Sequence, residues 1–461
     1  MRSLREPGRR KNAGSALRSH GGPPEPPLCG AAGAGRGPRG ADSAAAYGFL
    51  ALVTELQEWV FTDLPQGLGF DGAPPWWPLP PLALAGVVVG LTIRSLPGRG
   101  GHSPADGFKP GGVPSPVELP GIAIAALATL SLGAVLGPEA PLIALGAGLA
   151  AAAVRLARRD APAEATAVVG AAGSFAAIST LLGSPLLGAF LLMEASGLGG
   201  PTLGLVLVPG LVAAGVGSLI FTGLDAWTGL GTFSLALPDL PSFTRPDLAQ
   251  FGWALVIGLA AAVVGTTIRR LALLLRPHVE RRLVLLTPLA GLVVGALAMA
   301  YAEVSGHSFS EVLFSGQDAL GPLIGQSAGY SVGALLLLMA CKGLAYSVSL
   351  ASFRGGPVFP AMFLGAAGGI ALSHLPGLPL VAGVAMGIGA MSVAMLRLPL
   401  TSVLLATLLL AEDGLAVMPL VIVAVAVAYV ATARLTPAAP VPTSSTSGDA
   451  GLLARTHDAR R

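Results

Sequence analysis

A glutamate with a glycine and two prolines around it stands directly before an apolar run. Glu139 lies in the sequence Gly137-Pro-Glu-Ala-Pro141. Proline fits the first turn of a helix, because the backbone N–H groups there have no acceptor within the helix. Those free N–H groups and the helix dipole form an electropositive pole that attracts anions. The motif predicts an anion site made of backbone amides, in which the Glu139 carboxylate competes with a mobile anion until it is protonated. The open alternative is a solvated loop with an N-cap-like glutamate.

The same pattern occurs a second time, 219 residues further on. Gly356-Pro-Val-Phe-Pro360 matches the first motif, and Gly173 with Pro185-Leu186 has its counterpart in Gly387 with Pro399-Leu400. A duplicated unit with broken helices in matching positions is, in transporters, the sequence pattern of a substrate site between two halves. Two electropositive poles that converge from two repeats predict a site for a small anion.

The composition identifies the surroundings that must position these motifs. Of 461 residues, 53% are hydrophobic and only 11% are charged, and the mean hydropathy is +0.73. This composition excludes an ordinary soluble enzyme and indicates a chain with the lipid bilayer as its solvent. The 64 glycines and 39 prolines indicate short, interrupted helices. Several apolar runs fall short of the roughly 20 residues that span the hydrocarbon, so their ends must line a path enclosed by protein.

We therefore predict an all-α polytopic membrane protein with two repeated, inverted halves and broken re-entrant helices. The membrane domain covers residues 45–435, with repeat one at about 75–235 and repeat two at about 247–435. Residues 1–44 form a basic, disordered tail on the cytosolic side, and residues 436–461 form a second disordered tail.

Several kinds of partner and site are not predicted. The net charge of +3 comes from a basic excess at the chain ends, which argues against nucleic acid. Cys29 and Cys341 support neither a disulfide framework nor a cysteine metal site. His and carboxylate clusters at ligand spacing are missing from the sequence, and so is a nucleophile with a base. We expect no metal, no cofactor and no enzyme activity.

Two further charged residues lie within apolar stretches. Glu194 follows Pro185 by nine positions, and an ionisable residue at such depth is a candidate for function. It is a candidate inner proton acceptor. The alternative is that it ends a short helix and hydrogen-bonds in a vestibule or at a subunit interface. Lys342 could supply positive potential to an anion pathway, or it could simply snorkel.

Taken together, these motifs resemble the CLC family of chloride channels and proton-coupled chloride transporters over about residues 45–434. The family's Gly-Lys/Arg-Glu-Gly-Pro signature is similar to Gly137–Pro141. Its Gly-x-Phe-x-Pro signature, preceded by Lys and Ser, looks like Gly355–Pro360 preceded by Lys342 and Ser349. Its Arg-Ala-Pro-Leu-Thr sequence is similar to Arg397–Thr401.

The resemblance implies roles for particular residues. Glu139 would be the outer gating glutamate and Glu194 a possible inner proton glutamate, although Ala195 stands at the place of the family's own inner acceptor. The protein would be a homodimer with one pathway in each subunit. The anion would be bound at Gly137, Ala140, Gly356, Val358, Phe359, Gly101 and Ser103.

This chain departs from the family at the anion site. Pro357 has no N–H to offer, and Val358 replaces a phenylalanine. In place of the Gly-Ser-Gly-Ile-Pro signature, Gly101 stands where the family has a serine, with a hydroxyl two residues later at Ser103. The family's last helix, with an anion-binding tyrosine, has no match, and Tyr429 lies one helix too early.

These observations predict transport of chloride or a similar small anion, gated by Glu139 in response to pH, with pH-gated conduction favoured over proton exchange. The alternatives are a proton-coupled chloride antiporter and a fluoride exporter of the same fold, and a more remote one is a transport-inactive scaffold. The expected partners are the anion, protons, the lipid bilayer and a second copy of the chain. The expected location is a bacterial inner membrane, crossed several times.

Overall fold

The computed structural model describes residues 38–108, 112–197, 201–229, 237, 242–243 and 245–436. Most of the predicted N-terminal tail and nearly all of the predicted C-terminal tail lie outside these residues. Helix α2 (Pro38–Glu58) begins within the stretch predicted as tail, so residues 38–44 are helical instead. Alanines after Asp42 favour a helix there, because alanine has the highest helix propensity.

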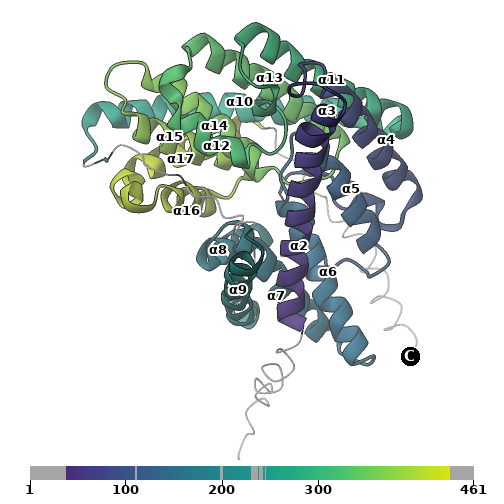
Figure 1. Cartoon of the computed structure of the whole chain (residues 1–461). Coiled ribbons are helices and arrows are strands. Elements are labelled where there is room, and N and C mark those ends of the chain that lie inside the picture. The colour runs from purple at the N-terminus through teal and green to yellow at the C-terminus, as the bar shows by residue number, and fades with distance from the viewer. Residues whose placement is uncertain are drawn as a thin grey trace, which may run out of the picture. The chain divides into compact units, whose positions relative to one another are not determined.

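The regular structure of the described residues is helical throughout (Figure 1). Helix α2 continues through a π-helical turn, η1 (Trp59–Asp63), into α3 (Leu64–Gly67). The first half then holds α4 (Leu79–Ser95), α5 (Leu119–Ser131), α6 (Glu139–Ala157), α7 (Ala163–Leu181), α8 (Pro185–Ser196) and α9 (Pro201–Thr228). The second half holds α10 (Leu248–Arg281), α11 (Leu283–Ser305), α12 (Gln317–Gly325), α13 (Val332–Ser352), α14 (Val358–Ser373), α15 (Leu380–Leu396), α16 (Pro399–Leu409) and α17 (Gly414–Leu435).

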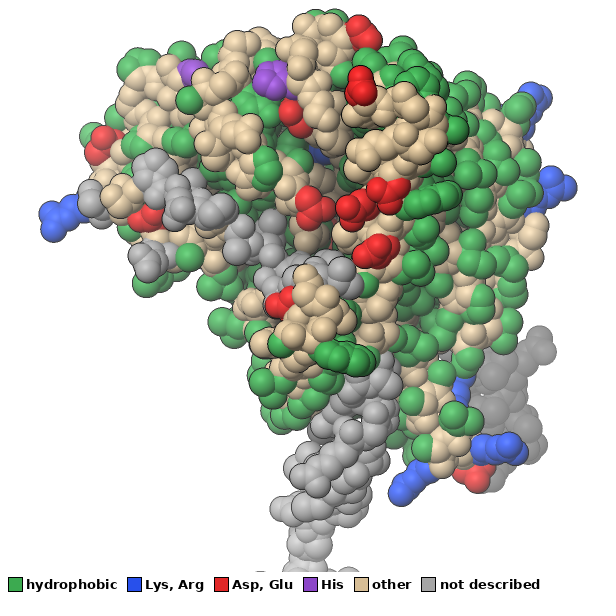
Figure 2. Space-filling model, viewed as in Figure 1, with side chains coloured by type: hydrophobic (Ala, Val, Ile, Leu, Met, Phe, Trp, Pro, Cys, Tyr) green, Lys and Arg blue, Asp and Glu red, His purple; other side chains and the backbone are tan. Residues whose placement is uncertain are grey.

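Seven of the described helices are long and apolar enough to cross a membrane: α6, α7, α9 over Leu207–Thr228, α10, α11, α13 and α17. By contrast, α8 has 12 residues and α16 has 11, too few to cross. Figure 2 shows many hydrophobic side chains on the visible face, with several carboxylates near its middle and Lys and Arg mostly at its edges. Large apolar side chains such as Leu219 and Leu274 are 75% and 67% exposed, as expected of a surface that faces lipid. The predicted all-helical membrane protein is confirmed.

The helices that carry the two motifs are packed against their neighbours at glycines. A Cβ atom on Gly365 of α14 would lie 2.2 Å from the carbonyl oxygen of Gly387 in α15. The equivalent helices of the first half, α6 and α7, meet in the same way at Gly146 and Gly173, where a Cβ on Gly173 would lie 2.3 Å from the Gly146 oxygen. Backbone contact of this kind fixes the start of each motif helix relative to the rest of its half.

The two motifs meet directly. The N–H of Gly137 donates to the carbonyl of Gly356 at 2.8 Å, and the N–H of Gly356 donates to the carbonyl of Gly137 at 2.6 Å. This pair forms an isolated antiparallel bridge. Because each of the two residues donates its N–H to the carbonyl of the other, a local two-fold axis relates the two motifs.

Two side chains near the ends of the preceding helices also form a reciprocal pair of hydrogen bonds between the halves. Ser349, near the end of α13, accepts a hydrogen bond at its Oγ from the N–H of Val135, at 3.1 Å. Thr129, near the end of α5, accepts one at its Oγ1 from the N–H of Arg354, at 3.3 Å. Each half therefore supplies a buried hydroxyl that holds the segment leading into the other half's motif.

Candidate functional site

The carboxylate of Glu139 lies at the start of the other half's motif helix. Glu139 is the first residue of α6 and is fully buried. Its Oε1 accepts a hydrogen bond from the backbone N–H of Phe359, the second residue of α14, at 2.8 Å. The backbone amide of Val358 also faces the carboxylate. The negative charge therefore occupies the electropositive helix start that would otherwise attract an anion.

The prolines lie in the first turn of each motif helix. Pro141 and Pro360 are the third residues of α6 and α14. The first four N–H groups of a helix have no acceptor within it, so proline removes no helical hydrogen bond at the third position. At the start of α14 this leaves the N–H groups of Val358 and Phe359 as donors.

Gly137 and Gly356 contribute space, not hydrogen bonds to an anion. Their N–H groups are used on each other in the bridge between the halves. A Cβ atom on Gly356 would lie 1.7 Å from Oε2 of Glu139, and one on Gly137 would lie 2.3 Å from it. Only glycine therefore allows the carboxylate to reach its place.

The second carboxylate oxygen of Glu139 differs from the first, which accepts a hydrogen bond from Phe359. Within the part of the chain that the structure describes, Oε2 is buried and has no hydrogen-bond partner. A buried carboxylate oxygen without a donor is costly, because it has lost its water and gained nothing in return. Glu139 is thus held by a small number of donors in a site that could also accept a free anion.

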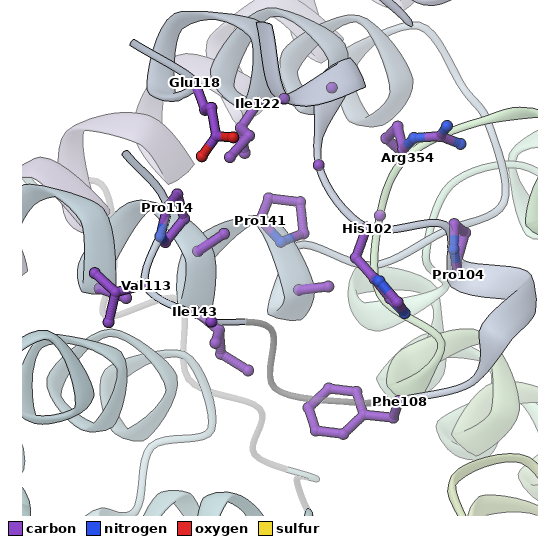
Figure 3. A pocket seen from close by; sticks show the side chains of 18 of the residues that line it. His102, Pro104, Phe108, Val113, Pro114, Glu118, Ile122, Pro141, Ile143 and Arg354 are labelled. Carbon is purple, nitrogen blue, oxygen red and sulfur yellow. The ribbon is translucent and has the colours of Figure 1, made fainter. Parts of the chain in front are cut away.

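A cavity of about 380 Å³ adjoins this site (Figure 3). Ala140 and Pro141 at the start of α6 line it, together with Gly355 and Pro357 before α14. The N–H of Ala140 lies in the first turn of α6 and has no acceptor within the helix. The lining also includes Gly101, His102, Gly107, Glu118, Ile122 and Arg354.

Of the two positions expected from the first signature, one lines the cavity. Gly101 lies in its wall, in a backbone conformation with φ of 92° that favours glycine. Ser103 is not among the lining residues, although its neighbours His102 and Pro104 are.

Tyr346 is a residue of this site that the sequence analysis missed. It is fully buried in α13, and its hydroxyl donates to the carbonyl of Pro357 at 2.8 Å, directly before α14. It also lies close enough to Glu139 for electrostatic interaction. Tyr429, the tyrosine considered from the resemblance, is 41% exposed on α17. The sequence feature that could have indicated Tyr346 is a single tyrosine within an apolar helix, because a buried phenol needs a hydrogen-bond partner for its hydroxyl.

Glu194 binds the start of a helix in the other half. Its Oε1 accepts from the N–H of Leu400 at 3.0 Å, and its Oε2 accepts from the N–H and the hydroxyl of Thr401 at 2.8 and 2.6 Å. These donors belong to the first turn of α16, whose own N-cap residue, Leu398, makes no side-chain cap. Glu194 therefore caps α16 from α8 across the two halves.

The ammonium group of Lys342 is hydrogen-bonded to backbone carbonyls. It is fully buried in α13, and its Nζ donates to the carbonyl oxygens of Glu311, Val312 and Leu313 at 2.8, 3.1 and 3.0 Å. It also lies 4.4 Å from the ring centre of Phe363 in α14. The charge thus anchors the segment before α12.

The family comparison agrees with this geometry. The family model described as voltage gated chloride channel matches residues 85–433. The putative ion-transport protein YfeO of Escherichia coli (strain SMS-3-5 / SECEC) is 31% identical over 335 residues, which cover 72% of this chain and 76% of the relative. The protein of the same name from Escherichia fergusonii matches with the same identity and coverage.

Solved structures share the fold. A slow cyanobacterial Cl⁻/H⁺ antiporter matches with a TM-score of 0.69 at 20% identity, over 94% of this chain and 98% of that chain. A CLC-type fluoride/proton antiporter matches with a TM-score of 0.65 at 19% identity, over 88% of this chain and 96% of that chain. Since the family model covers well over half of the sequence and includes both halves of the bridged motif, the chain belongs to the voltage-gated chloride channel family, the CLC family.

Proposed function

We propose that this protein carries chloride or a similarly small anion across the membrane and that Glu139 gates its path. The observation that carries the proposal is the hydrogen bond from the N–H of Phe359 to the Glu139 carboxylate, at 2.8 Å. The ionised carboxylate occupies the anion's place at the start of α14. Protonation removes its charge and releases it, so anion flux rises as the pH falls.

Two observations favour a pH-gated channel over a proton-coupled exchanger. Ala195 stands where the resemblance puts the inner proton acceptor, and alanine cannot carry a proton. The neighbouring carboxylate, Glu194, accepts three hydrogen bonds at the start of α16. A carboxylate held in this way is occupied as a helix cap.

Two alternative functions come from the solved structures of the same fold. These are described as a Cl⁻/H⁺ antiporter and a fluoride/proton antiporter. In an antiporter, protons would reach Glu139 through Glu194 or water. In a fluoride exporter, the altered positions at Gly101 and Val358 would set the preference for the smaller ion. In each case we expect a multi-pass homodimer of the bacterial inner membrane.

The test is anion flux from liposomes that contain the purified full-length protein, measured at several pH values. In Glu139→Gln the neutral side chain competes poorly for the α14 start, so flux at neutral pH should rise and its pH dependence should flatten. Glu164→Gln, an exposed carboxylate in the first turn of α7, is the matched control. Unchanged flux and pH response in Glu139→Gln would remove its gating role.

A reversal-potential measurement separates the alternatives. In chloride and fluoride gradients at two pH values, a channel follows the anion gradient alone, whereas an antiporter also responds to the proton gradient. A fluoride exporter shows its response in fluoride only. Protein that moves no anion in any halide gradient would support the scaffold alternative and contradict this proposal.

A further inference from the structure

A second cavity, of about 320 Å³, lies among four helices of the second half. Residues of α10, α13, α14 and α15 line it, and each of these helices contacts at least two of the others (Figure 1). It shares no lining residue with the cavity beside Glu139. Every lining side chain is apolar, and the other lining residues are glycines. The role of this cavity is therefore separate from that of the anion site.

The chemistry of the lining excludes water as the natural occupant. A buried water needs about two to four polar partners, whereas an engineered protein cavity of about 150 Å³ lined by aliphatic and aromatic side chains stays dry and binds benzene. The cavity described here is larger, and its volume lies within the roughly 300–1,000 Å³ that is usual for ligand sites. It suits an apolar ligand.

The cavity opens on the lipid-facing surface. Leu336 of α13 and Leu375, just after α14, line the cavity and are 57% and 47% exposed. On α10, Leu259 and Val263 lie beside lining residues and are 53% and 56% exposed. In a protein that crosses the membrane, an apolar surface of this kind is in contact with lipid. The molecules at the mouth of the cavity are therefore lipids.

The depth of the cavity in the bilayer fits the chains of a lipid and not its head group. Helix α10 begins at a polar capping box of Asp247 and Gln250, and the partly exposed Trp253 follows. Tryptophan is enriched where the membrane meets water. The lining residues Ile257 to Val264 lie about 6 to 16 Å further along the helix, at roughly 1.5 Å per residue. One leaflet of the hydrocarbon is about 15 Å deep.

Glycines make the room for a ligand on α14. Gly365, Gly368 and Gly369 all line the cavity. A Cβ atom on Gly368 would meet the flexible end of the Met339 side chain, 3.2 Å from its Cε. Helix α14 therefore presents backbone to the cavity at these positions, and a ligand can approach it closely. Met339 and Met391 also line the cavity, and methionine side chains adapt to the shape of a neighbour.

We propose that an acyl chain of a membrane phospholipid occupies this cavity and packs against the glycines of α14. The chain makes dispersion contacts with lining atoms that otherwise have no partner on that side. It supports α14, the helix whose second residue donates to Glu139. The inference does not depend on the proposed function, because contact between lipid and protein is measured without an anion gradient.

The test is photolabelling of the full-length protein in phosphatidylcholine vesicles that contain a phosphatidylcholine with a diazirine in its acyl chain. Mass spectrometry then identifies the labelled residues. Leu274 of α10 is 67% exposed outside the cavity and reports ordinary contact with the bilayer. Met391 is 2% exposed, so the label should reach it only from within the cavity. We expect labels on Met339 and Met391 as well as on Leu274.

Filling the cavity should remove those internal labels. Ala260→Trp places an indole among the lining residues and should lose the labels on Met339 and Met391 while keeping the label on Leu274. Gly368→Leu fills the cavity from α14 and should give the same loss, which keeps the test valid if one variant fails to fold. Ala296→Trp changes an exposed alanine of α11 outside the cavity and should leave all three labels in place.

Labelling of Leu274 without Met339 and Met391 in the unaltered protein would overturn the inference. That result is expected if a second copy of the chain, or the side chains of the lining itself, closes the cavity. Internal labels that persist in both filled variants would also overturn it, because they would not come from a chain in this cavity.

The melting temperature of delipidated protein gives a second readout. Added phosphatidylcholine should raise it in the unaltered protein and in Ala296→Trp, because a ligand that binds the folded state stabilises that state. The rise should be smaller in Ala260→Trp, whose cavity is already filled. An equal rise in all three proteins would mean that the lipid stabilises the outer surface alone, and the proposed support of α14 would be wrong.

Discussion

The carboxylate of Glu139 and the backbone N–H of Phe359 lie 2.8 Å apart, although 220 residues separate them in the chain. One belongs to the first motif helix and the other to the second. The contact depends on the bridge between Gly137 and Gly356, which brings the two helix starts together. The place of the Glu139 carboxylate is thus set by backbone hydrogen bonds between the halves.

We expect Gly356→Ala to conflict with Glu139. The new Cβ would lie 1.7 Å from Oε2 of Glu139, so the carboxylate must leave its place at the start of α14. Flux at neutral pH should rise, and the protein should lose roughly 1–3 kcal/mol of stability from the clash, as in other overpacked sites. Liposome flux and thermal unfolding in detergent measure the two effects.

A double-mutant cycle identifies the cause. Truncation in Glu139→Ala removes the clashing atoms, so adding Gly356→Ala should then cost far less stability. Gly252→Ala is the control, because a Cβ on Gly252 would meet nothing within 4 Å. An equal cost of Gly356→Ala with and without the glutamate side chain would place the strain in the bridge and contradict the clash with the gate.

We expect Tyr346→Phe to loosen the start of α14. The substitution removes the hydroxyl that donates to the Pro357 carbonyl and leaves that buried oxygen without this donor. The expected loss of stability is about 1–3 kcal/mol, with a weaker anion site next to it. Tyr429→Phe changes an exposed tyrosine and should have little effect on melting temperature or chloride affinity. Equal melting temperatures for the two variants would count against a supporting role for Tyr346.

The meeting of the motifs could be predicted from the sequence because the pattern is itself physical. Glycine, proline and a following apolar run define a helix start with free N–H groups. The repetition of that start in a membrane chain predicts that the two starts face each other. The sequence placed Glu139 at the first of these helix starts, whereas in the structure its carboxylate reaches the N–H of Phe359 at the second.

The supporting residues could not be predicted in the same way. Tyr346 acts through Pro357 in another helix, and Lys342 acts through the carbonyls of residues 311–313, so neither contact leaves a local pattern. Arg354 in the wall of the cavity beside Glu139 stands directly before α14, and Gly107 in the same wall lies beside Arg269 of α10. From sequence, Arg269 and Arg270 look like interfacial anchors, because nothing local shows that α10 passes Gly107.

We expect Glu194 to act as a helix cap, with a measurable effect on stability. Glu194→Ala removes the acceptor of three hydrogen bonds at the start of α16 and should cost about 1–3 kcal/mol. Thr401→Val removes one of those bonds, so its cost should nearly vanish in the Glu194→Ala background. Glu303→Ala, an exposed carboxylate on α11, is the control in the same thermal unfolding measurement. Loss of uphill proton movement in Glu194→Gln at an unchanged melting temperature would instead favour the exchanger.

We expect Lys342→Met to disturb the gate from a distance. Methionine fills a similar volume but leaves the carbonyls of residues 311–313 without their donor. The net loss of stability should be about 2–4 kcal/mol, since a buried charge is removed together with its hydrogen bonds. The released segment continues to Phe314, whose N–H donates to Gly133 just before the first motif, at 3.3 Å. Flux should therefore change together with the melting temperature.

Arg282→Met, an exposed cation at the end of α10, should change neither flux nor melting temperature. A stable Lys342→Met protein with altered anion selectivity would mean that the lysine acts on the anion directly.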